Sequence, residues 1–260
     1  MIDLAAIAAR VAASAIAASG ETGLWRAPIV GAVSASRVVA ARLREIASPT
    51  HLLPSDLLVG ARSVVCFFVP FAKEVSDGNS SGDDASAGWG RAYVRTNRLI
   101  AEIGEGIAAS LAGLGYRAAT VPATHNFDEE TLLSDWSHRH LAYLAGIGSF
   151  GLNNMLITDS GAAGRLGSAV TDVPLAGPDP APARERCLAK LDGSCRACLA
   201  RCPVGALSQG TFNRRACYDV CLRNARRLTD VGYADVCGKC VVALPCSLRD
   251  PTRGRSGPAA

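Results

Sequence analysis

Cys195-Arg-Ala-Cys198-Leu-Ala-Arg-Cys202-Pro203 is the densest cysteine motif in this 260-residue chain. Nine of the ten cysteines fall in the segment 187–246, and only one stands elsewhere. Disulfide frameworks usually spread through small secreted chains, whereas closely paired thiols in one segment are typical of metal or cluster binding. The segment therefore predicts a small unit that is held together by bound metal.

The spacing of this motif favours iron–sulfur clusters. Bacterial ferredoxins space their cysteines as C-x2-C-x2-C-x3-C-P. Here the run is C-x2-C-x3-C-P, Asp192 stands at the leading position, and Cys187 is the available substitute. The second group of cysteines is Cys217, Cys221, Cys237, Cys240 and Cys246. Two four-thiolate 4Fe–4S clusters can be formed from these nine thiols, and two all-thiolate zinc sites are the alternative, because structural zinc also uses paired C-x2-C elements.

The rest of the chain has the pattern of alternating helices and strands. The apolar run over 61–71 is suited to a strand buried on both faces. The expected strands are 28–36, 61–71, 116–123, 154–158 and 168–175, and the expected helices are 1–20, 37–46, 93–114 and 128–144. Such alternation predicts an α/β (α+β) core. We expect residues 1–180 to form this core and residues 181–250 to form a ferredoxin-like cluster lobe, entered through a Pro-rich hinge at 177–183, with 251–260 as a tail.

Composition and charge exclude several classes of protein. No apolar run reaches the roughly 18–20 residues that a membrane span needs. Asp3 and Arg10 interrupt the opening segment, which therefore lacks the pattern of a secretory signal. The net charge of +4 is too small to indicate a nucleic-acid partner. We expect a cytoplasmic protein without membrane association, in which Cys66, inside the apolar run, is a buried structural thiol.

Two further motifs accompany the cysteines. One is Ala145-Gly146-Ile147-Gly148-Ser149-Phe150-Gly151-Leu152-Asn153, and the other runs from Gly167-Ser168 to Thr171-Asp172-Val173-Pro174-Leu175. Together with the cysteines they resemble the epoxyqueuosine reductase family and its relatives among the reductive dehalogenases. The resemblance implies a nitroreductase-like α/β core that binds a corrinoid such as cobalamin, and two 4Fe–4S clusters that supply it with electrons. It also implies an electron donor such as a ferredoxin or flavodoxin.

The resemblance further implies which cysteines bind each cluster. The first cluster would be held by Cys187, Cys195, Cys198 and Cys246. The second cluster would be held by Cys202, Cys217, Cys237 and Cys240. Cys221 would then be the spare thiol, and its exchange with Cys217 or Cys187 is the alternative.

The glycine motif and the residues before it are candidates for cofactor binding. Its G-x-G-x-x-G string follows a helical stretch rather than a strand, which argues against a dinucleotide site. The glycines instead predict close approach of the backbone to a large flat ligand or to another chain segment, with a tight helix-to-strand turn as the alternative. The predicted cofactor-binding residues are Gly146, Gly148, Gly151, Asn153, His138 and His140. For the two histidines a solvated or core role is the simpler interpretation.

Tyr93 is the predicted proton donor. The resembled reductases carry an R-Y-A-x-G-R-D-Y-H segment whose Asp would donate a proton. In this chain Tyr93 matches the tyrosine of the segment, whereas Asn97 and Arg98 stand where the Asp is expected. An amide cannot act as a general acid, so the role passes to Tyr93, with a tyrosine that caps the core as the alternative. Arg165 could meet a phosphate or carboxylate, although a surface arginine is the simpler interpretation.

Taken together, these patterns predict an oxidoreductase that passes electrons through two 4Fe–4S clusters to a cofactor and a small-molecule substrate on the α/β core. A non-catalytic ferredoxin-type electron carrier is the first alternative. A zinc-binding interaction module is the second.

Overall fold

A four-stranded antiparallel sheet forms the centre of the computed structural model, which describes residues 2–208 and 210–254. The strand order is β1 (Ile29–Ser34), β2 (Ser63–Pro70), β6 (Gly164–Thr171) and β3 (Ala118–Thr120). All eight residues of β2 are buried, because the strand lies between β1 and β6 and both faces of the sheet are covered. Its register with β6 runs from Ser63 opposite Thr171 to Pro70 opposite Gly164.

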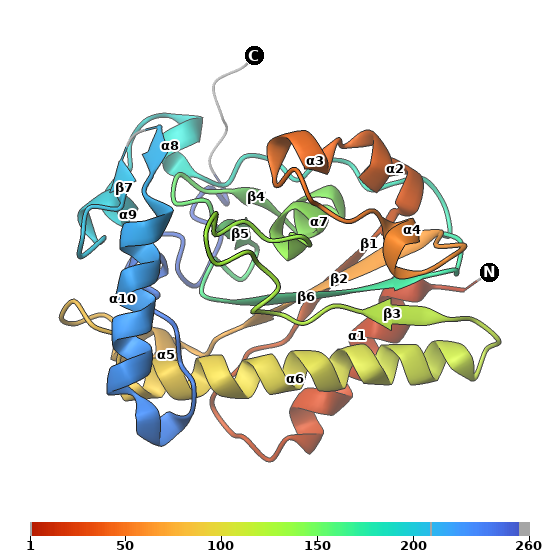
Figure 1. Cartoon of the computed structure of the whole chain (residues 1–260), viewed down its shortest axis with the longest axis horizontal. Helices are drawn as coiled ribbons and strands as arrows, with labels where there is room; N and C mark the ends of the chain where they lie inside the picture. The colour runs from red at the N-terminus through yellow and green to blue at the C-terminus, as the bar shows by residue number, and fades with distance from the viewer. Residues whose placement is uncertain (1, 209, 255–260) are drawn as a thin grey trace.

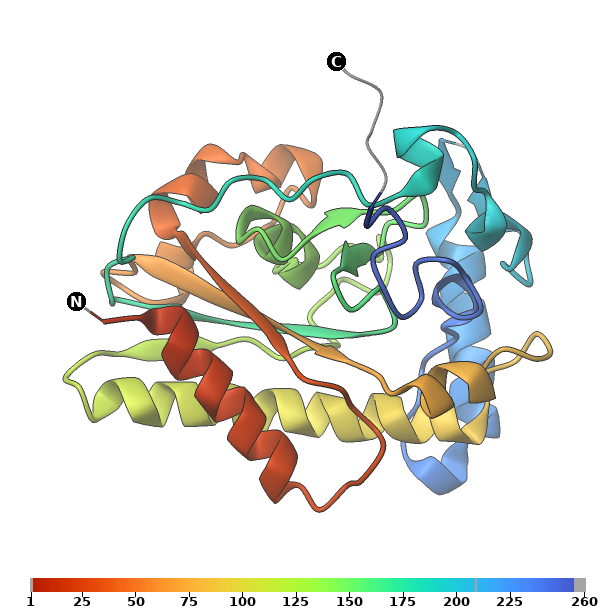
Figure 2. The same cartoon turned by 180° about the vertical axis from the view of Figure 1, so that it is seen from behind.

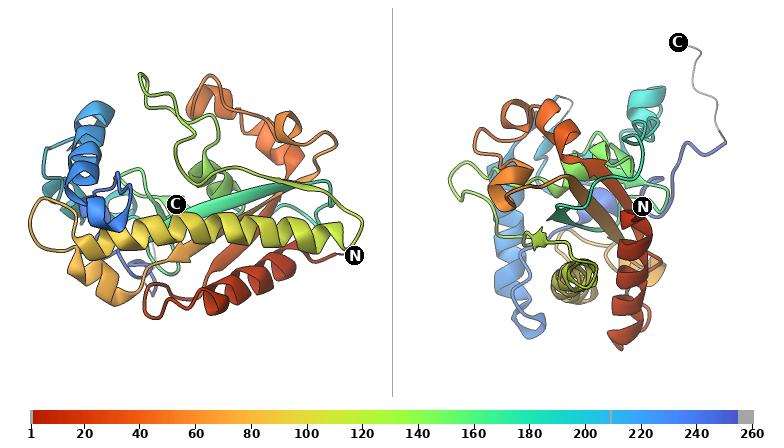
Figure 3. Two further views of the ribbon diagram at one scale, coloured as in Figure 1. Left: turned by 60° about the horizontal axis from the view of Figure 1, so that its bottom comes forward. Right: turned by 90° about the vertical axis from the view of Figure 1, so that its right-hand side faces the viewer.

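Two helices cover one face of this sheet (Figures 1 and 3). Helix α1 (Leu4–Ala18) begins at Asp3, whose side chain accepts a hydrogen bond from the backbone N–H of Ala6. Helix α6 (Ala87–Ala112) begins at Ser86, whose hydroxyl accepts from the N–H of Trp89. Such caps satisfy backbone donors that have no partner inside the helix. The residues Leu99, Ile103, Ile107 and Leu111 recur every four positions and pack into the core beneath β2 and β6. No helix within the described residues is long and apolar enough to cross a membrane.

The opposite face of the sheet carries shorter elements. They are α2 (Ala35–Ala40), α3 (Leu43–Ile46), α4 (Pro54–Leu57), α7 (His138–Leu144) and the hairpin of β4 (Gly148–Phe150) with β5 (Leu156–Thr158). Trp136, Leu141 and Ala145 pack there against Phe68 and Val170 of the sheet. The view from behind in Figure 2 shows these elements above the sheet and α1 with α6 below it.

The cysteine-rich segment forms a lobe at the end of the sheet where β2 ends and β6 begins (Figure 1). Its elements are α8 (Leu188–Leu191), α9 (Ala197–Ala200), β7 (Leu207–Ser208), β8 (Thr211–Phe212), α10 (Arg214–Arg227), η1 (Thr229–Val231) and η2 (Lys239–Val241). Helix α10 stands across the end of α6, close to α5 (Lys73–Gly78). The hydrogen bond from the N–H of Ala163 to the carbonyl of Ser247 joins the lobe to the segment before β6.

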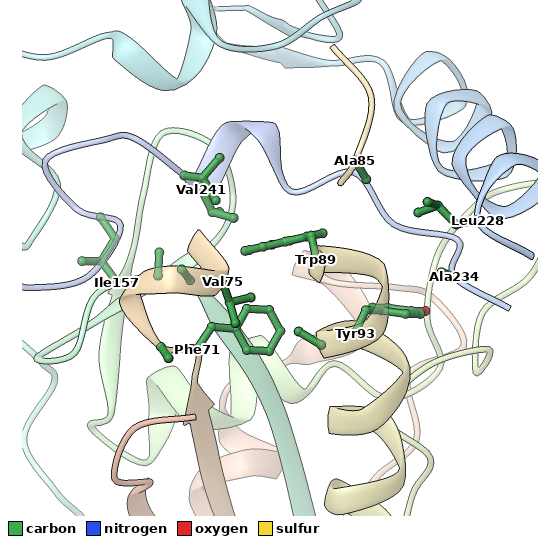
Figure 4. Close-up of a cluster of buried hydrophobic side chains, with 14 of the residues drawn as sticks. Phe71, Val75, Ala85, Trp89, Tyr93, Ile157, Leu228, Ala234 and Val241 are labelled. Atoms are coloured by element: carbon green, nitrogen blue, oxygen red, sulfur yellow. The ribbon is translucent and has the colours of Figure 1, made fainter. Parts of the chain in front are cut away.

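The lobe and the core share one cluster of buried side chains (Figure 4). Phe71, Trp89 and Tyr93 of the core pack there with Leu228 and Val241 of the lobe. The buried Arg186 side chain adds ion pairs with Asp250 at 3.2 Å and Asp159 at 2.9 Å. The lobe is therefore packed on the core through a continuous interior.

The mixed architecture confirms the predicted α/β class, but several predicted elements differ. The helix predicted over 37–46 breaks at Arg42, whose backbone is left-handed with φ of 53°. The helix predicted over 128–144 is wrong in its first half: it begins only at His138, because Asp128 closes a turn with Thr131 and Leu132 has φ of 56°. The expected hinge at 177–183 is tied to the core, since the Asp179 carboxylate accepts from the N–H and the hydroxyl of Ser34.

Candidate cofactor and redox site

Four thiols face a small enclosed space between the lobe and the β4–β5 hairpin. Cys187 precedes α8, Cys198 lies in α9, and Cys195 and Cys246 lie in the adjoining loops. These four side chains line one cavity of about 20 Å³, together with Gly151 and other hairpin residues. They also interact electrostatically with one another, which shows that the four sulfurs lie close together. The structure thus brings together the cysteines that the family resemblance assigned to the first cluster.

The other five thiols of the lobe line a larger cleft of about 400 Å³ between the lobe and the core. Cys217 and Cys221 lie one turn apart on α10 and are hydrogen-bonded through their sulfurs. Cys237 and Cys240 flank the start of η2, and Cys202 follows α9. The predicted second ligand set is therefore gathered at one wall of the cleft, with Cys221 as a fifth thiol.

The two groups are interleaved along the chain. Cys202 belongs to the first cysteine motif but lines the cleft with the thiols of the second ligand set. Cys246 follows the second C-x2-C pair but lines the small cavity with the thiols of the first ligand set. Asn153 lines both cavities, and its side-chain amide donates to the carbonyl of Cys240. The two groups are thus neighbours, bridged by a residue of the core.

Burial and mutual proximity disfavour ionisation of several of these thiols. Burial and, to a lesser degree, the nearby sulfurs of Cys187, Cys198 and Cys195 together raise the pKa of Cys246 to about 12. The pKa of the Cys240 thiol is also raised, first by burial and then by the neighbouring sulfurs. Sulfurs in such surroundings remain thiolates at neutral pH only when a cation is bound to them, because metal ligation displaces the proton. The donor set therefore suits a cationic iron–sulfur centre.

The core side of the cleft carries a hydrogen-bonded group centred on Tyr93. The Tyr93 hydroxyl donates to Asp235 Oδ1 at 2.6 Å and lies 3.1 Å from the Thr124 hydroxyl. The other carboxylate oxygen of Asp235 lies 3.1 Å from Nε2 of His125. Burial raises the pKa of Tyr93 to about 12, although the Arg165 guanidinium, 4.3 Å from the ring centre, opposes this shift. At neutral pH Tyr93 is thus a protonated phenol that faces the cleft.

A second, smaller pocket of about 220 Å³ adjoins the cleft. The two share Arg139, Met155, Gly164 and Arg165 in their linings. His138 lines the smaller pocket, where Nδ1 lies 2.9 Å from the Ser168 hydroxyl and Nε2 lies 3.1 Å from the carbonyl of Pro122. The Trp136 indole donates to the same serine hydroxyl. Because the carbonyl of Pro122 can only accept a hydrogen bond, the proton of the neutral His138 ring lies on Nε2, and Nδ1 accepts from the Ser168 hydroxyl.

The predicted cofactor-binding residues divide between the cavities and the hairpin packing. His138, Asn153 and Gly151 each line a cavity. Gly146 and Gly148 instead approach other chain segments: a side chain at Gly148 would lie 2.4 Å from the carbonyl oxygen of Ile157, and one at Gly146 would lie 3.2 Å from Pro180. His140 packs against Phe150, with ring centres 4.9 Å apart. These glycines allow close backbone packing, which is one of the roles that the sequence predicted.

Asp235 is the residue that sequence reasoning missed. The family pattern directs attention to an acidic residue near Tyr93 in the sequence, whereas Asp235 lies 142 positions away, among the lobe cysteines. Its side chain is only 5% exposed and is held by Tyr93 and His125. The signal available was its position two residues before Cys237, which places it near any site that the cysteines form.

Comparison with known proteins gives the same picture as the motifs. Models of known families do not match the chain. An epoxyqueuosine reductase of Synechococcus sp. (strain CC9605) is 31% identical over 166 residues, which is 63% of this chain and 46% of that protein. The chain thus spans about half the length of the curated relative that it matches.

Two solved structures show the likeness in fold. An epoxyqueuosine reductase with an epoxyqueuosine-modified tRNA-Tyr stem loop matches with a TM-score of 0.55 at 20% identity, over 95% of this chain and 70% of that one. A catabolic reductive dehalogenase in complex with 3-bromo-4-hydroxybenzoic acid matches with a TM-score of 0.58 at 22% identity, over 87% of this chain and 31% of that one. Identities this low show shared fold alone. Sequence and fold together confirm that this chain is similar to the epoxyqueuosine reductases. Its fold is also similar to that of a reductive dehalogenase.

Proposed function

We propose that this chain is an iron–sulfur oxidoreductase, in which electrons pass through two 4Fe–4S clusters to a corrinoid and a substrate in the cleft. The observation that supports it most is the grouping of the lobe thiols around two neighbouring cavities, one of which opens toward Tyr93. An electron carrier needs cluster ligands but has no need of a cleft that joins a cluster site to a buried phenol. The cleft therefore favours an enzyme.

The residues present fit two clusters. Thiolate ligands on short loops are the usual ligands of iron–sulfur centres. In the described residues, no three His, Cys, Asp or Glu side chains are placed around a point where a single metal ion could be bound, whereas the thiols line cavities. This arrangement accords with a multi-atom cluster better than with a zinc ion. Bound clusters would supply one-electron transfer, and the cysteines would hold them side by side across Asn153.

The proposed place of the second cofactor is the core side of the cleft and the adjoining pocket. The cleft and the adjoining pocket share four lining residues and so form one extended site. Together they offer roughly the volume range of small-molecule and cofactor sites. Aromatic side chains such as Phe71 and Phe127 give the cleft an apolar lining, and arginines stand among them. Such a lining suits a flat, largely apolar ligand with a polar rim, and a corrinoid would supply a metal centre that reduces the substrate.

Within this site Tyr93 would donate the proton that the reduced substrate needs. Its phenol remains protonated at neutral pH, because burial raises its pKa to about 12. The tyrosinate left after proton transfer would be stabilised by the Arg165 guanidinium over its ring. Thr124, 3.1 Å from the hydroxyl, offers that hydroxyl a second hydrogen-bond partner besides Asp235. An external ferredoxin or flavodoxin would supply the electrons.

Metal analysis of the full chain, purified without oxygen, tests the proposal. We expect a brown protein with about eight iron atoms per chain, as two four-iron clusters require, and about one cobalt atom for one corrinoid. Iron without cobalt would favour the electron carrier. Zinc without iron would overturn the proposal in favour of an interaction module.

Cysteine variants test the ligand sets. Cys198→Ser and Cys240→Ser should each lose about four iron atoms, one cluster's worth, and each should remove a different reduced-cluster signal in electron paramagnetic resonance. Cys66→Ala is the matched control, because Cys66 is fully buried in β2 and belongs to neither group. Full iron content in Cys198→Ser or Cys240→Ser would refute the assignment.

The proposed substrate is a small molecule. The tRNA stem loop is bound by the epoxyqueuosine reductase of known structure, and the net charge of +4 gives no independent sign of an RNA partner here. Oxidation of reduced methyl viologen by the protein, with that stem loop as the only added substrate, separates the two classes. Steady oxidation would assign RNA as the substrate, and its absence supports a small molecule.

A further inference from the structure

Arg165 is a residue of the cleft whose hydrogen bonds are incomplete. It follows Gly164 at the start of β6 and lines both the cleft and the adjoining pocket. Its guanidinium lies 4.3 Å from the centre of the Tyr93 ring, and one terminal nitrogen donates to the carbonyl of Ala123 over a long 3.3 Å. Its Nε is buried and has no hydrogen-bond partner among the described residues. A buried guanidinium donor without a partner is costly, so its retention calls for an acceptor.

The charged residues that line the cleft are mostly basic. They are Arg139, Arg165, Arg214 and Lys239, against Asp235 alone. The Lys239 ammonium is bound by the carbonyls of Asn79 and Ser81, each at 2.8 Å. The Asp235 carboxylate is engaged by Tyr93 and His125. The single carboxylate in the cleft lining thus already has other partners, and the remaining charged residues of the lining are cations like Arg165 itself.

The arginines differ in what lies near them. Arg139 interacts electrostatically with Arg214 and with the sulfurs of Cys240 and Cys217. Its positive charge therefore lies close to the thiols of the cleft. Arg165 interacts instead with Tyr93 and Asp235, on the core side of the cleft. Arg139 uses one nitrogen to donate to the carbonyl of Asn154 at 2.6 Å, which fixes its position at the boundary of the two pockets. Arg165 is thus a cation on the core side of the cleft with one donor unused, and Arg139 lines the same cleft.

The space next to these arginines is apolar. Trp89, Phe127, Leu132 and Phe212 line the cleft, and the Trp89 indole N–H is a second buried donor without a partner in the described residues. Two unpartnered donors in this lining can be satisfied by acceptor atoms of a ligand, and the apolar walls suit a ligand with an apolar body. Guanidinium groups recognise carboxylate and phosphate best, because their planar fork matches two acceptor oxygens.

We propose that Arg165, assisted by Arg139, binds a carboxylate or phosphate group of a small substrate with an apolar body, and so holds the substrate beside Tyr93. This inference rests on the proposed function, since it names the class of substrate for the same cleft. The same anionic chemistry could come from the nucleotide phosphate of a corrinoid. We assign it to the substrate, because Arg165 stands over the proposed proton donor.

Binding of simple probes to the full chain tests the proposal without any need for turnover. Calorimetry would compare benzoate and phenyl phosphate with neutral benzamide, on protein purified without oxygen and with its iron content measured. We expect both anions to bind at least about tenfold more tightly than benzamide, as one charge-assisted hydrogen-bonded pair allows. Arg165→Gln should remove this preference and leave benzamide binding unchanged. Arg165→Lys should restore part of it.

Two further variants complete the test. Arg139→Gln should weaken benzoate binding less than Arg165→Gln does. Arg226→Gln is the matched control, because it removes the same charge from an exposed position on α10 outside the cleft lining. Equal benzoate affinity in Arg165→Gln, Arg226→Gln and the parent would overturn the proposal, whatever the iron content of the protein.

Corrinoid probes distinguish the source of the anionic group. Cobinamide lacks the nucleotide phosphate that cobalamin carries. Benzoate binding that persists beside bound cobinamide and is lost in Arg165→Gln supports the substrate site. If Arg165→Gln instead weakens cobalamin and not cobinamide, and leaves benzoate unaffected, the arginine serves the cofactor and the assignment to substrate is wrong. Iron and cobalt contents are read separately, so a failure of the proposed function would not be mistaken for a failure of this site.

Discussion

At the scale of single residues, Tyr93 shows how its surroundings suit a side chain for one role. Burial favours the neutral phenol and raises its pKa to about 12, while the Arg165 guanidinium favours the phenolate to a lesser degree. The phenol therefore keeps its proton throughout the neutral and mildly alkaline range. The positive charge of Arg165, which lies over the ring, would stabilise the tyrosinate that forms when the proton leaves.

The ionisation of Tyr93 can be followed by absorbance. Between pH 9 and 11 we expect Tyr93 to remain protonated, because of its raised pKa. The rise in tyrosinate absorbance at 295 nm over that range should therefore be the same for the parent and for Tyr93→Phe, with circular dichroism as the check that the chain stays folded. A smaller rise in the variant would show that Tyr93 ionises in this range and would contradict the described environment.

His138 makes the stability of the fold depend on pH. Burial lowers its pKa to about 4 from an ordinary value of 6.5, so the folded chain holds it neutral where the unfolded chain binds a proton. Its contribution to stability is complete above pH 6.5 and is lost as the pH falls toward 4. At pH 5 this amounts to about 2 kcal/mol of the free energy of unfolding. Urea unfolding at pH 7.5 and pH 5 should show a smaller loss of stability for His138→Gln than for the parent, and an equal loss would contradict this account.

Residues of the site were predictable where the chemistry lies in local spacing. The metal-binding character of the lobe follows from its closely spaced cysteines, the family resemblance implied how they divide, and the structure gathers them around two cavities. Asp235 was not predictable, because its contact with Tyr93 spans 142 positions and depends on how the lobe packs on the core. The same limit applies to Arg165, whose place between two pockets has no signature in the sequence.

At the scale of elements, the loop between Cys237 and Cys240 depends on one glycine. Gly238 has φ of 75°, a left-handed conformation that favours glycine. A Cβ there would lie 2.3 Å from the Trp89 indole, which is itself 3% exposed and cannot move aside. The indole and the cysteine loop therefore fit together only because this side chain is absent.

A pair of alanine variants separates backbone strain from this packing. Gly193 also has φ of 75°, but a Cβ there would have no neighbour within 4 Å. Gly193→Ala should cost about 1–2 kcal/mol of unfolding free energy, from the left-handed backbone alone. Gly238→Ala should cost about 1–3 kcal/mol more through overpacking, and should also lose iron from the second group. Equal losses of stability in urea unfolding of the two variants would show that the indole does not constrain the loop.

Elements were predictable where one pattern dominates, and uncertain where local turns compete. The buried strand β2 and the helix α6 follow from an apolar run and a four-residue repeat. The helix expected from residue 128 fails because the Asp128 carboxylate binds the N–H and hydroxyl of Thr131, an alternative that short polar side chains offer to the backbone. Residues 148–150 form the strand β4, which periodicity could not reveal in a glycine-rich stretch, because its pairing with β5 is a tertiary contact.

At the scale of the whole molecule, the lobe and the core should unfold together. They share the buried cluster of Phe71, Trp89, Tyr93, Leu228 and Val241, and the ion pair of Arg186 with Asp159 connects them. A unit with a continuous interior unfolds as one, whereas units that are joined by a hinge unfold separately. We therefore propose that the division expected at residue 180 separates two functional regions, and that these two regions unfold together.

Unfolding followed by two probes tests this view. In urea without oxygen, the visible absorbance of the clusters reports the lobe, and circular dichroism, to which the sheet and the long helices contribute most, reports the core. We expect the two transitions to coincide, because loss of the clusters exposes the shared interior. Loss of cluster absorbance well below the urea concentration that unfolds the core would show that the lobe unfolds independently.

The interleaving of the two thiol groups has a consequence for how such a protein can change over evolutionary time. Since Cys202 and Cys246 each lie with the group of the other motif, deletion of either motif would remove at least one thiol from both groups. Neither motif can therefore be lost without changing the thiols at both cavities, so the two sites are expected to change together over evolutionary time.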